Sequence, residues 1–227
     1  KTDSPRTAVI DFSSPNVAKP MHVGHIRSTI LGDCLARVLT LLGHQVVTDN
    51  HIGDWGTQFG KLIVGWKQHL DRDALMKDAL GELERLYRKV NSACDEDASV
   101  LESARKELVK LQQGDEENLS IWNEMQEVSR VQFDKVYQRL GIHFDHTLGE
   151  SFYNDQLKGV VGDLTEQGIA TESQGAKVVF FEDIDGLKDH PALILKSDGG
   201  ANYTTTDLAT IQYRVETWNP DEIIYVT

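Results

Sequence analysis

Residues 7–49 read TAVIDFSSPNVAKPMHVGHIRSTILGDCLARVLTLLGHQVVTD, and the pattern changes along this stretch. Thr7–Ser13 is mostly apolar and β-branched, which is typical of a buried strand, and a Ser-Pro-Asn triplet then interrupts it. From Gly24 to Leu42 apolar residues recur at helical spacing, and the glycine that follows is typical of a helix end. Gln45–Asp49 is a second strand-like run. The order strand, loop, helix, strand predicts a right-handed parallel βαβ unit.

The patterns downstream alternate between helices and short strands. They predict helices over 75–90, 100–111, 121–140 and 204–215, two antiparallel strands at 177–181 and 192–196, and a buried strand at 222–226. The fold class is therefore α/β, with a discontinuous Rossmann-like (HUP-type) parallel sheet that holds the strands near 8–12, 46–49, 144–148 and 223–226. We expect the first half of this domain at 1–60, a helical insertion at 61–120, a return at 121–149, a partly β insertion at 150–199 and a truncated last part at 200–227.

The motif His22-Val23-Gly24-His25 lies between the first predicted strand and the first predicted helix. A helix N-terminus presents unpaired backbone N–H groups and a partial positive charge, so it attracts phosphate. Gly24 leaves room for a base or ribose against the backbone. The two imidazoles can donate hydrogen bonds to phosphate oxygens, where charge builds up during displacement at phosphorus. The motif therefore predicts a nucleotide site.

Composition restricts the class of protein. The formal net charge is -13, so a large basic face for nucleic acid is not expected. The two cysteines, Cys34 and Cys94, are far apart and form no Cys-x-x-Cys pair, which excludes a disulfide framework and indicates a reducing compartment. We expect Cys34 to be a small core residue of the first helix. There is neither a membrane-length apolar run nor a signal-peptide pattern.

Four blocks carry a resemblance to a known family. They are FSSPNVAKPMHVGHIRST at 12–29, NHIGDWGTQFG at 50–60, LGESFYN at 148–154 and YTTTDLA at 203–209. Together, and in this order, they resemble arginyl-tRNA synthetases, and His22–His25 matches the HIGH motif of class I synthetases. No segment resembles the KMSKS signature of that class, and no anticodon-binding helical domain is present. The fragment is therefore expected to be inactive in aminoacylation by itself.

The resemblance implies ATP-dependent activation of L-arginine to arginyl-adenylate, followed by transfer to the 3′-terminal ribose of tRNA(Arg). It implies catalytic and ATP-binding roles for His22, Gly24, His25 and Lys19, and arginine binding by Asp11, Ser14, Pro15, Asn16, His25, Glu150, Tyr203 and Asp207. ATP would bring Mg²⁺ held mainly by phosphates and water, with no metal ligand from the protein. The expected protein is a cytoplasmic monomer without membrane contact.

Several interpretations stay open. The chain could instead be another H-x-G-H nucleotidyltransferase, of the pantetheine-phosphate or cytidylyl type, or a non-catalytic binding fragment. Asp54-Trp55-Gly56 is either a tight turn with a packed indole or the floor of the pocket. Lys19 either supports the ATP phosphates or is an ordinary surface lysine. Asp207, which we expect to select arginine together with Glu150 as buried carboxylates, could instead cap the helix that begins near Thr204.

Overall fold

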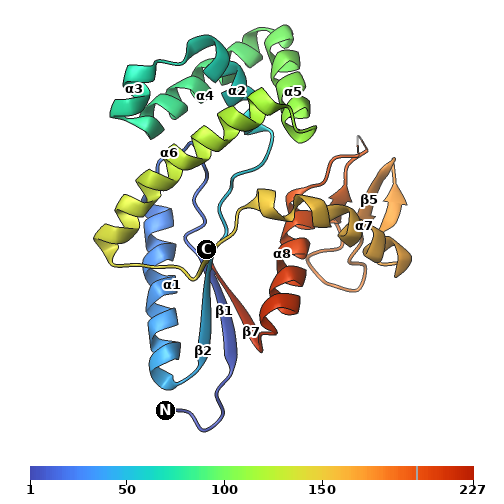
Figure 1. Ribbon diagram of the computed structural model, residues 1–227. Coiled ribbons are helices and arrows are strands. Elements are labelled where there is room, and N and C mark those ends of the chain that lie inside the picture. Colours follow the sequence, from blue (N-terminus) through green and yellow to red (C-terminus); the bar gives the residue numbers. More distant parts are fainter. Residues whose placement is uncertain (198) are drawn as a thin grey trace. The chain divides into compact units, whose positions relative to one another are not determined.

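The structure is a computed structural model that describes residues 1–197 and 199–227. The chain forms two compact units (Figure 1). The first contains Lys1–Gly149 and Ile223–Thr227, and the second contains Glu150–Glu222. Each unit is described by itself.

The first unit is built on a four-stranded sheet in the order β3-β2-β1-β7. Its strands are β1 (Thr7–Phe12), β2 (Gln45–Asn50), β3 (His146–Thr147) and β7 (Glu222–Val226). β1 pairs with β2 in parallel, from Thr7 opposite Gln45 to Asp11 opposite Asp49, and β2 pairs with β3 in parallel. The prediction that the four strands share one sheet is confirmed. We expected a buried strand at 222–226, but β7 is only partly buried, because it lies at the end of the strand order.

Helix α1 (Val23–Leu42) returns from the end of β1 to the start of β2, as the βαβ prediction requires (Figure 1). Its buried residues are small, namely Ser28, Thr29, Gly32 and Ala36, because the helix packs closely against β1. Most of its large apolar residues are exposed, namely Ile30, Leu31, Leu35, Val38, Leu41 and Leu42, whereas Leu39 packs against the core beside β1. Cys34 is exposed as well, so the expectation that it is a core residue is wrong. Helical spacing alone did not show which stripe of α1 packs on the sheet.

Five helices follow between β2 and β3: α2 (Gln58–His69), α3 (Arg72–Lys77), α4 (Ala79–Glu96), α5 (Ala98–Gln112) and α6 (Glu116–Leu140). The first four pack together, and α6 runs from them back toward the sheet (Figure 1). Phe59, Leu83 and Met125 are fully buried in the core that α2, α4 and α6 share. The helix predicted over 75–90 is interrupted at Asp78, whose carboxylate accepts from the Gly81 N–H at 3.1 Å and starts α4 anew.

The second unit places helices beside a small antiparallel sheet. It contains the 3₁₀ helix η1 (Glu150–Gln156), α7 (Leu157–Glu166), β4 (Thr171–Ser173), β5 (Ala176–Val179), β6 (Ala192–Leu195) and α8 (Tyr203–Trp218). The strand order is β4-β5-β6, so the predicted antiparallel pair is confirmed. β4 was not predicted because its three residues, Thr-Glu-Ser, show no apolar pattern. The core of the second unit includes Val161, Ala170 and Ile194.

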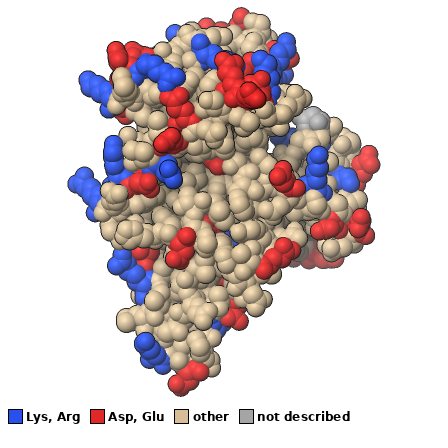
Figure 2. All heavy atoms as spheres, viewed as in Figure 1, with Lys and Arg blue, Asp and Glu red and all other residues tan. Residues whose placement is uncertain are grey.

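Acidic and basic side chains are mixed on one face of the helical region of the first unit (Figure 2). Figure 2 shows acidic and basic side chains interspersed over the helices labelled α3, α4 and α5 in Figure 1. No helix in the described residues is long and apolar enough to cross a membrane.

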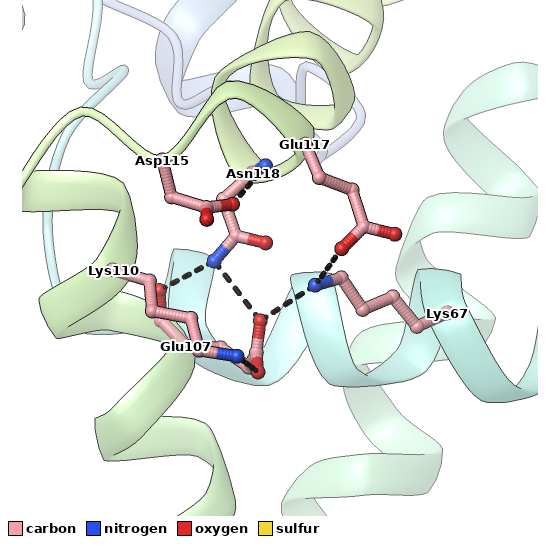
Figure 3. Close-up of polar contacts among 6 residues, drawn as sticks. All are labelled: Lys67, Glu107, Lys110, Asp115, Glu117 and Asn118. Atoms are coloured by element: carbon pink, nitrogen blue, oxygen red, sulfur yellow. Dashed lines mark hydrogen bonds and ion pairs between the residues drawn. The ribbon is translucent and has the colours of Figure 1, made fainter.

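One polar cluster joins three helices of this region (Figure 3). Lys67 of α2 donates to Glu107 of α5 at 2.8 Å and to Glu117 of α6 at 2.7 Å. Lys110 donates to the other Glu107 oxygen at 2.8 Å, and the Asn118 amide donates to Glu107 at 2.9 Å. The cluster fixes where α5 and α6 meet α2, because every donor converges on one carboxylate.

The acidity of Glu107 follows from this arrangement. Burial by itself raises the pKa of Glu107, but the hydrogen bonds from Lys110, Lys67 and Asn118 outweigh it and lower the pKa to about 2. A carboxyl whose pKa is lower in the folded than in the unfolded state stabilises the fold above the unfolded pKa of 4.5. That stabilisation is lost as the pH falls from 4.5 toward 2.

We therefore expect Glu107→Gln to lower the free energy of unfolding by about 1–3 kcal/mol at pH 7, the usual scale for hydrogen bonds to charged groups. The difference from the parent should shrink as the pH falls below 4.5, as measured by urea unfolding at a series of pH values. Glu102→Gln is the matched control on the same helix, since its ion pair with Arg105 is long, at 3.9 Å, and exposed. Equal effects of the two variants at every pH would contradict the role given to the cluster.

Candidate functional site at the carboxyl edge of the sheet

The candidate site is the loop that leaves β1 and enters α1. This loop pairs with the segment that leaves β2: the Val17 N–H donates to the Gly53 carbonyl, and the Gly53 N–H donates to the Pro15 carbonyl, both at 3.0 Å. The two contacts form an isolated parallel bridge between Asn16 and Gly53. Parallel pairing of the strands thus continues past their ends, and it holds the loop at the carboxyl edge, where open parallel sheets bind their ligands.

The first predicted arginine-binding residues are brought together at the end of β1. The Ser14 hydroxyl donates to Asp11 Oδ1 at 2.9 Å, and the Ser14 N–H donates to Asn50 Oδ1 at 3.1 Å. Asp11 and Pro15 are buried, whereas Asn16 is exposed. An acidic group and an exposed amide therefore flank one hydroxyl, which is a suitable arrangement for a polar, positively charged ligand.

The histidine pair forms the N-terminal cap of α1. His22 is the N-cap residue: its Nδ1 accepts from the Gly24 N–H at 3.1 Å, and His25 Nδ1 accepts from the His22 N–H at 3.2 Å. The two rings lie 3.9 Å apart between centroids. A Cβ at Gly24 would come within 2.9 Å of the His22 ring, so the glycine is needed for this cap as well as for an open backbone.

This cap determines which ring nitrogens remain available. Because each Nδ1 accepts a backbone hydrogen bond, the neutral rings carry their proton on Nε2. Each Nε2–H is then a donor that does not take part in the cap. The first turn of α1 contains no acidic residue, so no carboxylate offsets the partial positive charge of the helix end. The arrangement can bind and stabilise phosphate.

His25 has a lowered pKa. Burial is the main cause, and repulsion from His22 adds to it. The lowered pKa keeps the ring neutral, as the Nδ1 acceptor role requires. Since the unfolded chain then binds the proton more tightly, His25 protonation destabilises the fold as the pH falls below 6.5.

Lys19 is exposed and lies over an aromatic ring of the helical region. Its Nζ is 5.7 Å from the centroid of the Tyr87 ring on α4, within cation–π distance. The structure thus gives Lys19 a partner other than the histidine pair.

The remaining predicted residues belong to the second unit. Glu150 begins η1 and is half-buried, and Tyr203 and Asp207 are exposed on α8 one turn apart. The expectation of a buried Asp207 is wrong, because the inward face of α8 is formed by Thr205, Ala209 and neighbours at helical spacing from them. Asp207 does not cap α8 either, since the N-cap is Asn202.

Asp54-Trp55-Gly56 is an irregular segment that bends at Gly56, and its indole is packed. Trp55 meets Trp122 edge-on at 5.8 Å, and the Asp54 carbonyl accepts from Trp122 Nε1 at 2.9 Å. Beside this segment is a cavity of about 450 Å³ lined by Asp54, by residues of α6 and by Gly149. Among the described residues, none of those predicted for the site lines it.

Sequence reasoning missed a buried polar network beneath the loop. Tyr137 of α6 shares a 2.8 Å hydrogen bond with the Ser13 hydroxyl and accepts from Asn50 Nδ2 at 3.1 Å. Thr29 of α1 donates to the same Ser13 hydroxyl at 2.8 Å. Asn50 begins one of the four sequence blocks, which was a signal, but nothing in the helical pattern around Tyr137 indicated that its hydroxyl reaches β1.

Comparisons with known proteins agree on one family. A family model described as "tRNA synthetases class I (R), catalytic domain" matches residues 1–227. A protein named arginine–tRNA ligase from Fusobacterium nucleatum is 49% identical over 219 residues, covering 96% of this chain and 38% of the relative. One of the same name from Thermosynechococcus vestitus is 48% identical over 228 residues, covering 98% and 39%. The chain therefore spans about two fifths of the length of these relatives.

Solved structures show the same likeness. The crystal structure of an arginyl-tRNA synthetase from Plasmodium falciparum superimposes with a TM-score of 0.80 at 36% identity, covering 98% of this chain and 37% of that one. An arginyl-tRNA synthetase from Thermus thermophilus shares the fold, with a TM-score of 0.70 at 23% identity over 92% of this chain and 36% of that one.

The histidine pair leads to a test that needs no ligand. His22→Asn keeps a side-chain acceptor for the Gly24 N–H and removes the second imidazole. We expect the pKa of His25 to rise toward 6.5 without reaching it, because burial, the larger cause, remains. A titration of the His25 ring followed by NMR measures this, with His69→Asn, at the far end of α2, as the control that leaves His25 unchanged. An unaltered His25 midpoint in His22→Asn would show that the rings are not coupled.

Proposed function

The chain belongs to the catalytic-domain family of class I tRNA synthetases of the arginine type, and from this premise we propose that it activates L-arginine with ATP as part of a longer arginine–tRNA ligase. The arginine carboxylate attacks the α-phosphorus of ATP, pyrophosphate leaves, and arginyl-adenylate forms. The 3′-terminal ribose hydroxyl of tRNA(Arg) then attacks the arginyl carbonyl, and AMP leaves. The observation that carries the proposal is the pair of capping histidines at the start of α1, on a chain matched by this family throughout.

His22 and His25 act on ATP in this proposal. Their Nε2–H groups donate to phosphate oxygens, and the donation strengthens as charge develops at the α-phosphorus. The open backbone at Gly24 admits the nucleoside. Lys19 leaves Tyr87 and contacts the phosphates when ATP arrives. The residues therefore supply fixed donors at the helix end and one mobile charge.

The residues that we propose for arginine belong to the first unit (Asp11, Ser14, Pro15, Asn16 and His25) and to the second unit (Glu150, Tyr203 and Asp207). Asp11, Ser14, Pro15, Asn16 and His25 contact the amino-acid end of the substrate. Glu150 and Asp207 bind the guanidinium, which presents five donors in a planar fork that a carboxylate can accept side by side. Tyr203 is exposed one turn before Asp207 on the same face of α8, so the two can contact one ligand.

The remaining partners follow from the reaction. Among the described residues no group of three His, Cys, Asp or Glu could hold a metal ion. We propose that Mg²⁺ arrives with ATP and is held mainly by its phosphates and by water, as is usual for this ion. It would then neutralise charge on the departing pyrophosphate. We also propose that the enzyme is a monomer and that it charges tRNA in the cytoplasm.

The proposal is tested by ATP–pyrophosphate exchange with the full-length protein. Each of the standard amino acids is supplied in turn, with and without tRNA. We expect ATP–pyrophosphate exchange with arginine and with no other amino acid. Exchange driven by a phosphopantetheine or cytidylyl substrate would point to another H-x-G-H nucleotidyltransferase, and arginine binding without exchange to a non-catalytic module.

His22→Ala and His25→Ala in the full-length enzyme should each slow arginyl-adenylate formation by roughly 10²–10³-fold, the scale for losing one preorganised donor to developing charge. The loss should appear in kcat more than in the KM for ATP, because the donation strengthens in the transition state. Val23→Ala lies between them, is highly exposed, and should behave as the parent. Exchange rates at the parental level in both histidine variants would remove the pair from the mechanism.

Asp207→Asn keeps the shape of the side chain and removes its charge. We expect kcat/KM for arginine to fall by roughly 10²-fold, because a guanidinium would be desolvated without its partner, while the KM for ATP changes little. Glu216→Gln removes one charge from the exposed part of the same helix and should leave both parameters unchanged. If Asp207→Asn used arginine as well as the parent does, the guanidinium site would lie elsewhere.

A further inference from the structure

The loop between β1 and α1 is held in an unfavourable backbone conformation. Ser13, Ser14 and Ala18 have φ values of 78°, 47° and 63°, in the left-handed region that non-glycine residues rarely adopt. Such residues persist only where the surrounding structure holds them. Two of the three, Ser13 and Ala18, are buried, so water cannot satisfy their polar groups.

Helix α6 supplies part of what holds them. Its Tyr137 hydroxyl is 2.8 Å from Ser13 Oγ, and its Ser129 hydroxyl accepts from the Ala18 N–H at 3.1 Å. Ser129 is fully buried and Tyr137 nearly so. The two hydroxyls are eight residues apart on one face of α6, and they meet the loop at both ends of its strained part.

The network continues into residues that the proposed function uses. Tyr137 also accepts from the Asn50 amide, whose oxygen accepts from the Ser14 N–H. On the other side of the loop, a Cβ at Gly53 would lie 2.3 Å from Asn16 Oδ1, so Asn16 is confined against the backbone there. Neither the Ser14 nor the Asn16 side chain contacts α6 in these hydrogen bonds. Their positions depend on α6 indirectly, through the residues around them.

We propose that Tyr137 and Ser129 are positioning residues for arginine: from α6 they hold the loop Ser13–Ala18 in the conformation that presents Ser14 and Asn16 to the substrate. The inference rests on the proposed function. Burial raises the pKa of Tyr137, while its hydrogen bonds with Ser13 and Asn50 act against the rise, so the hydroxyl remains protonated and can donate. Tyr137 does not touch the substrate and acts through Ser13 and Asn50.

Tyr137→Phe in the full-length enzyme isolates the hydroxyl. The ring keeps its edge-on contact with Phe144 at 5.1 Å, so packing is preserved. We expect the KM for arginine in ATP–pyrophosphate exchange to rise about 5- to 20-fold, the scale of one or two lost hydrogen bonds, with the KM for ATP within about twofold of the parent. Ser129→Ala should shift the same parameter in the same direction.

Thr48→Val is the matched control. The Thr48 hydroxyl also makes two hydrogen bonds, both with Asp145, and valine keeps the β-branched shape in the same sheet. This variant should lower thermal stability about as much as Tyr137→Phe and leave the KM for arginine unchanged. If Thr48→Val raised the KM for arginine as much as Tyr137→Phe does, general destabilisation would explain both effects. That result would overturn the proposal.

Two further readouts separate positioning from other causes. Hydrogen exchange of the unliganded enzyme should show faster exchange over residues 13–18 in Tyr137→Phe and Ser129→Ala, with α1 unaffected. In a Ser13→Ala background, Tyr137→Phe should raise the KM for arginine less than it does in the parent, because only the hydrogen bond with Asn50 remains to be lost. Full additivity would show that Tyr137 does not act through Ser13.

The outcomes distinguish the two proposals. If the parent enzyme shows no arginine-dependent ATP–pyrophosphate exchange, the proposed function fails. The rates of hydrogen exchange over residues 13–18 then still decide whether α6 holds the loop. If the parent is active and both α6 variants keep its KM for arginine, the proposed function stands and the positioning role is overturned.

Discussion

The parallel pairing of β1 with β2 is the constraint on which the rest of the first unit depends. It brings Asp11 opposite Asp49, so both strands end at one edge, and it extends through the bridge between Asn16 and Gly53. The loop after β1 is thereby held against the segment that follows β2. Helix α1 begins at the same edge because the loop leads the chain there, and a helix N-terminus at that edge is suited to an anion.

The capping histidines combine a structural and a chemical role in one set of atoms. Their Nδ1 atoms satisfy backbone donors that a helix start would otherwise leave open, and this fixes the tautomer that leaves Nε2–H as a donor. The pair needs no further residue for its orientation within the cap. Preorganisation of this kind is what makes a donor effective where charge develops, because it need not reorient during the reaction.

The helical region between β2 and β3 contacts the site through its last helix. Its own fold is maintained by an apolar core and by the cluster around Glu107. Its last helix, α6, then extends beneath the loop that carries Ser14 and Asn16 and contacts it with buried hydroxyls. An insertion that could have been a separate appendage therefore bears on the geometry of the site.

The sequence by itself determined the kind of elements and their order. β-branched runs and helical spacing located most of the strands and helices, since local patterns depend on local backbone geometry. The H-x-G-H motif located the start of α1, because a cap is a local structure. Four blocks of residues sufficed to indicate the family.

Only the tertiary structure decided which faces are buried and which distant groups meet. The small stripe of α1, with Ser28 and Gly32, packs on β1 and leaves larger apolar residues outside, because close packing of helix on strand depends on the partner surface. The hydrogen bond between Ser13 and Tyr137 joins residues 124 positions apart. No local pattern encodes such a contact, because it depends on how the intervening helices pack and where α6 therefore passes.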